Sequence, residues 1–234
     1  PKITHDIMIP VGQNNNAESG QIVVVKVVVQ PSRNNLPSGH IIQVLGGHLA
    51  PGMEIDIAVH NYGIPSIWPD LVLSDVESID DEVSEKDKKS RVDLRHLPFV
   101  TIDGEDARDF DDAVYCEPRA RGGWLLYVAI ADVSHYVPVS KALDKEAYKR
   151  GNSVYFPQHV IPMLPEKLSN GLCSLNPHVD RLTLVCEMTL DKNGSVTRFR
   201  FLEGLIHSHA RLTYTQVAGI IAQKSDIRSG IRKQ

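Results

Sequence analysis

The chain has 234 residues, of which 42% are hydrophobic and 23% charged, and its formal net charge is −4. This composition is typical of a globular protein of one or two domains and excludes a disordered chain. The longest apolar stretch, residues 22–29, is interrupted by Lys26 and falls far short of the ~20 residues of a membrane-spanning helix, so we expect no membrane partner.

The charge is distributed unevenly along the chain. Residues 1–70 carry 3 basic and 5 acidic groups, residues 71–112 carry 6 and 14, and residues 113–234 carry 16 and 10. The negative charge is therefore concentrated in one central stretch. The last half is basic enough to hold a polyanion, although a plain solvated surface explains the same charges.

The three cysteines, Cys116, Cys173 and Cys186, are widely spaced in apolar surroundings. We expect buried, reduced thiols, which favours a cytoplasmic location. The sequence contains no CxxC or CxxH pair and no GxxxxGK loop. Neither a structural zinc site nor a nucleotide cofactor is therefore expected.

The first seventy residues predict short β-strands. A β-branched run covers residues 21–29, and further apolar runs cover residues 39–45 and 53–60, with turn-forming segments between them. Strands at this spacing predict a small β-barrel of the OB or cold-shock type over residues 1–68, and a generic β-domain is the alternative.

A charged helical linker is predicted over residues 69–91. Pro69 can occupy a first helical turn, and apolar residues from Leu71 to Ile79 recur near helical spacing. Ser84 is the predicted cap of a second helical turn. The charged stretch over residues 80–89 is interpreted as a solvated surface.

A second domain of the α+β class is predicted over residues 92–234. Its predicted strands cover residues 99–102, 113–116, 124–131, 183–190 and 196–205, and its predicted helices cover 144–150 and 213–221. Gly122 and Gly123 supply the turn between the second and third of these strands. The predicted fold class of the whole chain is therefore α+β.

Between the first two of these strands lies an acidic loop, in which residues 103–112 carry six carboxylates. Such a cluster costs folding free energy unless cations or solvent compensate its repulsion. Oxygen-rich clusters suit magnesium or manganese. The spacing excludes an EF-hand, because the third and fifth loop positions would be Glu105 and Ala107 without a glycine at the sixth. A solvated acidic turn remains the alternative.

The sequence resembles the catalytic-domain core of the ribonuclease II/ribonuclease R (RNB) family. The resemblance rests on residues 101–113, 128–134, 152–176 and 208–214. Within the family, the amino-acid sequence of the acidic loop is more similar to that of ribonuclease R than to that of ribonuclease II. Several motifs in one order over half of the chain are more specific than a single acidic loop.

The resemblance implies a 3′-to-5′ exoribonuclease that hydrolyses single-stranded RNA to nucleoside 5′-monophosphates, with a cold-shock-like domain guiding the RNA. Asp103, Asp109, Asp111 and Asp112 would hold magnesium, or manganese, and act in hydrolysis. Residues implied to contact RNA are Tyr155, which would stack on a base near the 3′ end, and Arg211. The family's catalytic domain continues past Gln234, so we expect the 234 residues to be poorly active alone.

Two alternatives of other classes remain open: an RNA-binding module with a catalytically silent acidic loop, and a structural domain stabilised by calcium or magnesium. Asp132 is interpreted either as support for the metal site or as a cap at the end of a strand. His207 and His209 alternate in sequence and suggest metal-free acid–base chemistry, against which surface histidines are the commoner explanation.

Overall fold

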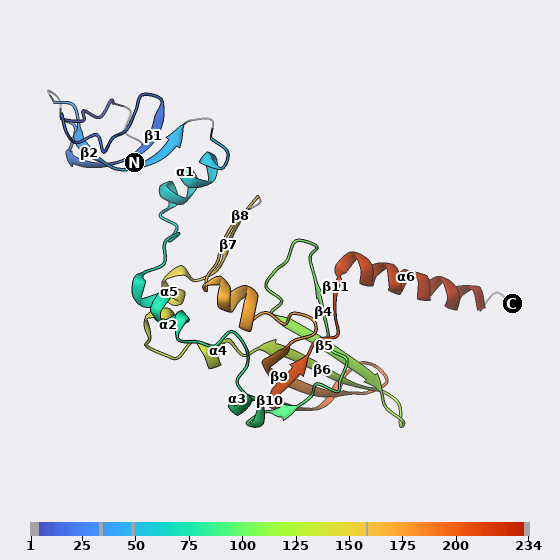
Figure 1. Cartoon of the computed structure of the whole chain (residues 1–234). Coiled ribbons are helices and arrows are strands. Elements are labelled where there is room, and N and C mark those ends of the chain that lie inside the picture. Colours follow the sequence, from blue (N-terminus) through green and yellow to red (C-terminus); the bar gives the residue numbers. More distant parts are fainter. Residues whose placement is uncertain (1–4, 33–34, 48–49, 158, 232–234) are drawn as a thin grey trace. The chain divides into compact units, whose positions relative to one another are not determined.

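The computed structural model describes residues 5–32, 35–47, 50–157 and 159–231, and its helices and strands are labelled in Figure 1. The chain divides into two compact units. The first comprises Pro1–Ile67 with Phe156–His159, and the second comprises Trp68–Tyr155 with Val160–Gln234. Strands and helices occur in both, so the predicted α+β class is confirmed. In the described residues, no helix is long and apolar enough to cross a membrane.

In the first unit, strands β1 (Gln21–Val29) and β2 (Ser38–Gly47) form an antiparallel pair. Valine dominates β1, because β-branched side chains pack well on a pleated surface. The register of the pair shifts at three points. Such bulges bend a strand and increase its twist.

The strand predicted over residues 53–60 is wrong, because the structure has helix α1 (Met53–Tyr62) there. The apolar residues alternate in sequence, but the flanking glycines favour a helix. Gly52 before the helix and Gly63 after it have φ values of 84° and 62°, which glycine adopts without steric cost. Acidic side chains in the first turn also stabilise the helix, because they interact favourably with the positive end of its dipole.

The second unit is built on a seven-stranded mixed sheet in the order β11-β4-β5-β6-β9-β10-β3. Its centre is antiparallel, whereas the edge strands β11 and β3 pair in parallel with β4 and β10. The strands of this sheet are β3 (Val92–Asp93), β4 (Val100–Asp103), β5 (Asp112–Pro118), β6 (Trp124–Ala131), β9 (Asp180–Leu190), β10 (Val196–His207) and β11 (Ala210–Thr213).

All five strands predicted for the second domain are confirmed as β4, β5, β6, β9 and β10. Strands β3 and β11 and the two-stranded pair of β7 (Val154–Phe156) with β8 (His159–Ile161) are not predicted from the sequence. Each of these is two to four residues long, which is too short to show an alternating pattern.

Along the chain, the helical elements of the second unit follow the order α2, α3, α4, α5, the π-helical segment η1 and α6. Their bounds are α2 (Asp70–Glu77), α3 (Glu85–Lys89), α4 (Val133–Tyr136), α5 (Ala142–Arg150), η1 (Lys167–Leu172) and α6 (Tyr214–Ile231). The helices predicted near 144–150 and 213–221 are confirmed, and the Ser84 hydroxyl accepts a hydrogen bond from the Asp87 amide at the start of α3, as predicted.

The segment predicted as a charged linker packs into the second unit. Val72 and Val76 of α2 and the nearby Val83 are buried in one cluster with Tyr136 and Leu143. These apolar residues form part of a hydrophobic core. Burial of each such side chain stabilises the folded state by about 1.5–3 kcal/mol. Of the charged side chains in this segment, Asp81 and Glu85 are exposed, whereas Lys88 is partly buried and Arg91 is buried.

A second hydrophobic cluster lies against one face of the sheet. Its members include Phe99, Ala129, Val185 and Ile206, together with Phe110 from the acidic loop. Phe110 is 5% exposed. The loop is therefore tied to the core by an apolar side chain that stands between two of its aspartates.

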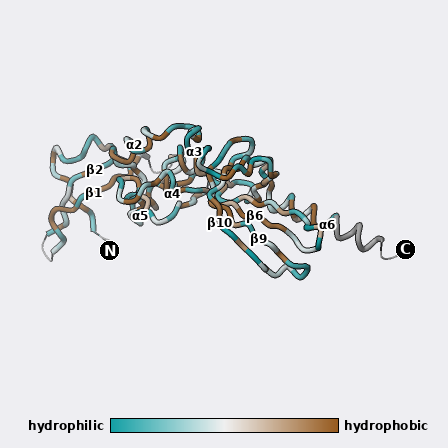
Figure 2. Tube along the Cα trace, turned by 90° about the horizontal axis from the view of Figure 1, so that it is seen from below, coloured by the Kyte–Doolittle hydropathy of each residue, from teal (hydrophilic) through white to brown (hydrophobic). Residues whose placement is uncertain are grey.

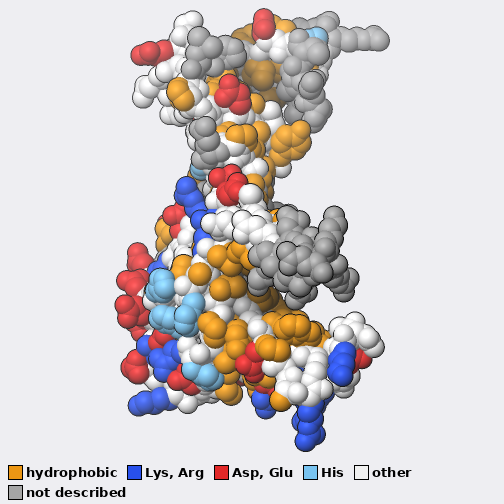
Figure 3. Space-filling view, turned by 90° about the vertical axis from the view of Figure 1, so that its right-hand side faces the viewer, with side chains coloured by type: hydrophobic (Ala, Val, Ile, Leu, Met, Phe, Trp, Pro, Cys, Tyr) orange, Lys and Arg blue, Asp and Glu red, His pale blue; other side chains and the backbone are white. Residues whose placement is uncertain are grey.

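On the other face of the central strands, here called the uncovered face, several apolar side chains are exposed in the described part of the second unit. Ile130 of β6 pairs with Leu184 of β9, and both are exposed, as are Phe199 and Phe201 of β10. Figure 2 colours the chain by hydropathy, and in Figure 3 hydrophobic side chains (orange) gather on a surface of the second unit. Strand alternation thus places one apolar set in the core and another at the surface.

The prediction that all three cysteines are buried is wrong for Cys116. Cys173 is buried and Cys186 is partly buried, but Cys116 is exposed, and the described part of the chain holds all three as free thiols. Cys116 pairs with Leu126 across β5 and β6, and Leu126 in turn pairs with Met188. Cys116 therefore lies on the uncovered face of the sheet.

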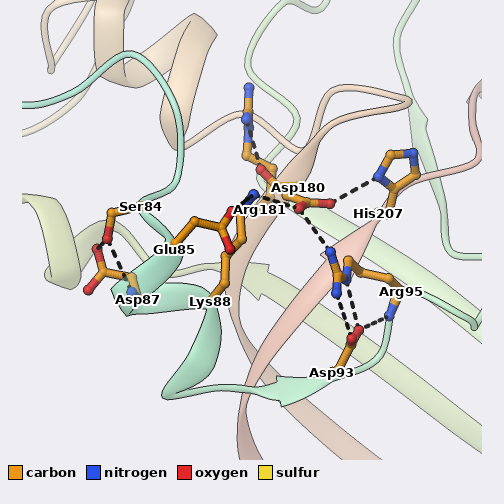
Figure 4. Close-up of polar contacts among 9 residues, drawn as sticks. All are labelled: Ser84, Glu85, Asp87, Lys88, Asp93, Arg95, Asp180, Arg181 and His207. Carbon is orange, nitrogen blue, oxygen red and sulfur yellow. Dashed lines mark hydrogen bonds and ion pairs between the residues drawn. The ribbon is translucent and has the colours of Figure 1, made fainter.

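One partly buried carboxylate joins several elements, as Figure 4 shows. Asp180, at the start of β9, accepts from Lys88 of α3 at 3.1 Å, from Arg95 after β3 at 3.2 Å and from His207 of β10 at 3.2 Å. These contacts hold the pKa of Asp180 below its usual value although burial acts in the opposite direction. They fix the end of β10 from which β11 follows.

Candidate active site

The acidic loop leaves and re-enters the sheet at its two ends. Asp103 is the last residue of β4, and Asp112 is the first residue of β5. These strands share only the pair Val100 and Val114, so the chain between them departs from the sheet. At the far end, the Ala131 amide donates to the Asp111 carbonyl at 2.9 Å, which fixes the loop against β6.

The four predicted aspartates lie close enough to interact electrostatically. Burial, and then the charge of Asp112, raises the pKa of Asp103, which the guanidinium of Arg211 partly offsets. The pKa of Asp111 is raised by partial desolvation of its carboxylate and then by the charges of the other three predicted aspartates. The loop therefore stores like-charge repulsion that a cation would relieve.

Tyr155 of β7 contacts the loop through its hydroxyl group. The hydroxyl donates a hydrogen bond of 2.6 Å to Oδ2 of Asp109, and this bond raises the pKa of Tyr155 to about 12. The residue is nevertheless 63% exposed. The structure thus brings together Tyr155 and the predicted acidic residues and leaves the tyrosine accessible.

Arg211 of β11 is turned toward the backbone of the loop. Its Nη2 donates to the carbonyls of Gly104 and Glu105 at 2.9 and 2.5 Å, and its guanidinium carbon lies 5.1 Å from the centre of the Phe110 ring. Its Nε is buried without a hydrogen-bond partner. Arg211 therefore joins the two arms of the loop, whereas its predicted contact with RNA stays a prediction.

Ser174 is a residue of the site that the sequence reasoning missed. Its hydroxyl contacts the backbone of Arg108 and Phe110, on either side of Asp109. The only signal in the sequence is that Ser174 falls within the run 152–176 that carries the family resemblance. Its distance from the loop along the chain gave no reason to connect the two.

The acidic residues fit magnesium by donor type and charge. All four supply oxygen, which magnesium prefers, and Oδ2 of Asp103 is buried without a hydrogen-bond partner. Within the ranges that the structure describes, however, no three acidic, histidine or cysteine side chains are arranged to hold a metal ion. The carboxylates are gathered, but their side chains do not form a finished coordination shell.

The other candidates lie in structural contacts. Asp132 accepts hydrogen bonds from the Ser134 hydroxyl and the His135 amide at the start of α4, and it forms a 2.7 Å ion pair with Arg91. This is the strand-end cap that was one of its two interpretations. His207 pairs with Asp180, and the His209 ring contacts the His207 carbonyl.

Two family models match the chain. The RNB domain model matches residues 91–232, and the cold shock domain model matches residues 1–69. The chain is 55% identical over 227 residues to ribonuclease R of Escherichia coli strain K12, and 55% identical over 218 residues to ribonuclease R of Acidithiobacillus ferrooxidans. These matches cover 97% and 93% of this chain but only 28% and 49% of the relatives.

Solved structures are also similar to this chain. The chain is similar to Mycoplasma genitalium RNase R in complex with double-stranded RNA, with a TM-score of 0.85 and 34% identity, over 94% of this chain and 39% of that one. Yeast Ssd1, described as a pseudonuclease, matches over 92% of this chain and 28% of that one, with a TM-score of 0.68 and 19% identity. The likeness to Ssd1 concerns the fold alone, and the fold therefore does not decide between a working and a silent loop.

Proposed function

Because the chain belongs to the RNB family, we propose that it is part of an exoribonuclease that removes nucleoside 5′-monophosphates from the 3′ end of single-stranded RNA. The observation that carries the proposal is that Asp103, Asp109, Asp111 and Asp112 lie close enough together to raise the pKa of Asp103 and of Asp111, and that Oδ2 of Asp103 is buried without a hydrogen-bond partner.

The proposed substrate class follows from the relatives and from the charge of the chain. Mycoplasma genitalium RNase R has been solved with double-stranded RNA and with ribose-methylated single-stranded RNA. In this chain, residues 113–234 have an excess of basic groups, and the exposed ring of Tyr155 lies beside the acidic loop. Basic groups that track a backbone and aromatic rings that stack on bases are the usual means of holding single strands.

The four aspartates would hold magnesium, with manganese as the alternative. When bound, the metal supplies positive charge that acidifies a water molecule and neutralises the leaving 3′-oxygen. The chain's own part is to hold the carboxylates in place and to orient the RNA end. The Tyr155 ring stacks on a base near the 3′ end, while its hydroxyl donates a hydrogen bond to Asp109.

The test is the change Asp111→Asn in the full-length protein, with Asp106→Asn as a matched control. Both remove one charge from the same loop, but Asp106 is not among the four predicted residues. Cleavage by Asp111→Asn should fall by about 10²–10³-fold, because a preorganised electrostatic contact is commonly worth this much. RNA affinity should not fall, since removing a carboxylate near phosphates eases repulsion.

Three outcomes decide the matter. Loss of cleavage by Asp111→Asn alone, with RNA binding retained, supports the proposal. Cleavage at the parental rate by a folded Asp111→Asn protein removes Asp111 from the site. RNA binding without chelator-sensitive cleavage by the parent itself favours an RNA-binding module with a silent loop.

A further inference from the structure

The hydroxyl group of Ser174 bridges the two residues that flank Asp109. It accepts a hydrogen bond from the Phe110 amide at 3.0 Å and donates one to the Arg108 carbonyl at 3.2 Å. A serine hydroxyl can do both at once, because it has one donor and two acceptor positions. One side chain thereby fixes the backbone on both sides of a predicted metal ligand.

Ser174 is itself held rigidly. It is fully buried, with 0% exposure, and its carbonyl accepts a hydrogen bond of 2.8 Å from Nε of the buried Arg181. The next residue, Leu175, belongs to the core cluster, and its amide donates to the Phe110 carbonyl at 2.9 Å. The segment that carries the hydroxyl is therefore anchored by a buried cation and by the hydrophobic core.

A fixed backbone matters here because the carboxylates of the acidic loop repel one another. Residues 103–112 carry six carboxylates, and repulsion among like charges this close together favours a spread loop. The contacts of Ser174 oppose that spreading without adding a charge. Both of its partners are backbone atoms, so it acts on Asp109 through the neighbouring residues and is not a catalytic residue.

We infer that Ser174 is a positioning residue, which holds the backbone on both sides of Asp109 and thereby favours the binding of a divalent cation by Asp103, Asp109, Asp111 and Asp112. The inference rests on the proposed function, since it assigns Ser174 a task only if these carboxylates bind metal. Partners behind the metal ligands commonly set 10–100-fold of metal affinity, and Ser174 occupies that position for the loop.

The test measures Mn²⁺ binding to the full-length protein by calorimetry, together with thermal unfolding in the presence of a chelator. Ser174→Ala removes both hydrogen bonds, and Ser208→Ala is the matched control. Ser208 is 1% exposed, and its hydroxyl contacts the Ala210 carbonyl at 3.4 Å rather than the acidic loop. Unfolding in chelator separates a change in metal affinity from a change in stability.

Ser174→Ala should weaken Mn²⁺ binding by about 10-fold or more, whereas Ser208→Ala should leave it within about twofold. Ser174→Cys keeps a weak donor and acceptor at the same place and should bind with intermediate affinity. It also serves as the test if the alanine variant does not fold. Parental Mn²⁺ affinity in a folded Ser174→Ala or Ser174→Cys chain would overturn the inference.

Asp111→Asn, measured beside these variants, separates the two ideas. If the parent binds Mn²⁺ and Asp111→Asn does not, the metal site stands and the Ser174 result decides the inference alone. If the parent binds no Mn²⁺, or Asp111→Asn binds it as the parent does, the proposed metal site is wrong and the role of Ser174 is overturned with it.

Discussion

The hydroxyl of Tyr155 donates a 2.6 Å hydrogen bond to Oδ2 of Asp109, so the residue predicted to hold RNA and a residue predicted to hold metal are in direct contact. They come from different segments, β7 and the loop between β4 and β5. The contact leaves the Tyr155 ring accessible while its hydroxyl is occupied. Its ring and its hydroxyl group therefore have separable tasks.

Substitutions at Tyr155 should separate these tasks. In the full-length protein, Tyr155→Ala should change the length of the final undegraded oligonucleotide, because a lost stack weakens the hold on the 3′ end by about 1–3 kcal/mol. Tyr155→Phe keeps the ring and should leave that length as in the parent. Product ladders on a sequencing gel measure both, and an unchanged ladder for Tyr155→Ala would remove this residue from the RNA site.

Magnesium should raise the thermal stability of the chain. Neutralising the repelling carboxylates favours the folded state, and at a concentration of 100 times Kd binding adds about 2.7 kcal/mol to the free energy of unfolding. Differential scanning calorimetry with magnesium and with chelator measures the shift. The shift should shrink in Asp111→Asn, and equal unfolding temperatures for the parent under both conditions would contradict the prediction.

Arg91→Met should destabilise the second unit strongly. Arg91 and Asp132 form a 2.7 Å ion pair in which both side chains are 5% exposed. Removing one member of a buried pair leaves an uncompensated charge and costs about 3–5 kcal/mol. Urea unfolding at neutral pH measures this loss, and Arg200→Met, at an exposed arginine paired with Glu187, should lose less than about 1 kcal/mol.

The Asp132 carboxylate should make the free energy of unfolding depend on pH in the acid range. Burial alone would raise the pKa of Asp132, but hydrogen bonds from Ser134 and Arg91 to the charged form outweigh it and lower the pKa below 3.8. The stabilisation from the charged Asp132 is therefore complete above pH 3.8, the ordinary pKa of the group, and it is lost as the pH falls through the lowered pKa of the folded state. Unfolding curves of Asp132→Asn should decline less steeply with acid than those of the parent. Parallel declines would count against the assignment.

Gly123→Ala should destabilise the chain more than Gly194→Ala. Both glycines have positive φ, 81° and 86°, so each substitution incurs the strain of a left-handed residue, about 1–2 kcal/mol. A Cβ at Gly123 would also collide with the Leu190 carbonyl, whereas nothing lies within 4 Å of one at Gly194. Chemical denaturation of the two variants compares them, and equal losses would exclude the collision.

The sequence predicts those parts of the fold whose signal is local. Strand β6 is a continuous apolar run, and the β9–β10 hairpin has its turn residues at Asp191–Gly194, so both are recognised from neighbouring residues. Helix α1 is missed because its apolar residues alternate as in a strand, and its flanking glycines decide the outcome. Strand β11 is missed because four residues carry no period.

The same distinction holds for the candidate site. Asp103, Asp109, Asp111 and Asp112 fall within ten residues, so their clustering is visible in the sequence. The contacts that shape the loop come from far along the chain, and sequence spacing gives no sign of them. Ser174 and Arg211 are the examples, since each contacts loop backbone that is 64 to 107 residues away.

The parallel pairing of β11 with β4 also determines when the loop can form during synthesis. The β5–β6 hairpin pairs residues that are close along the chain, whereas β4 has a single pair with β5 and gains four pairs only when residues 210–213 are present. Contacts between distant segments form late, because a long loop has to be closed first. A nascent chain that ends before Ala210 therefore lacks the pairing that fixes Asp103.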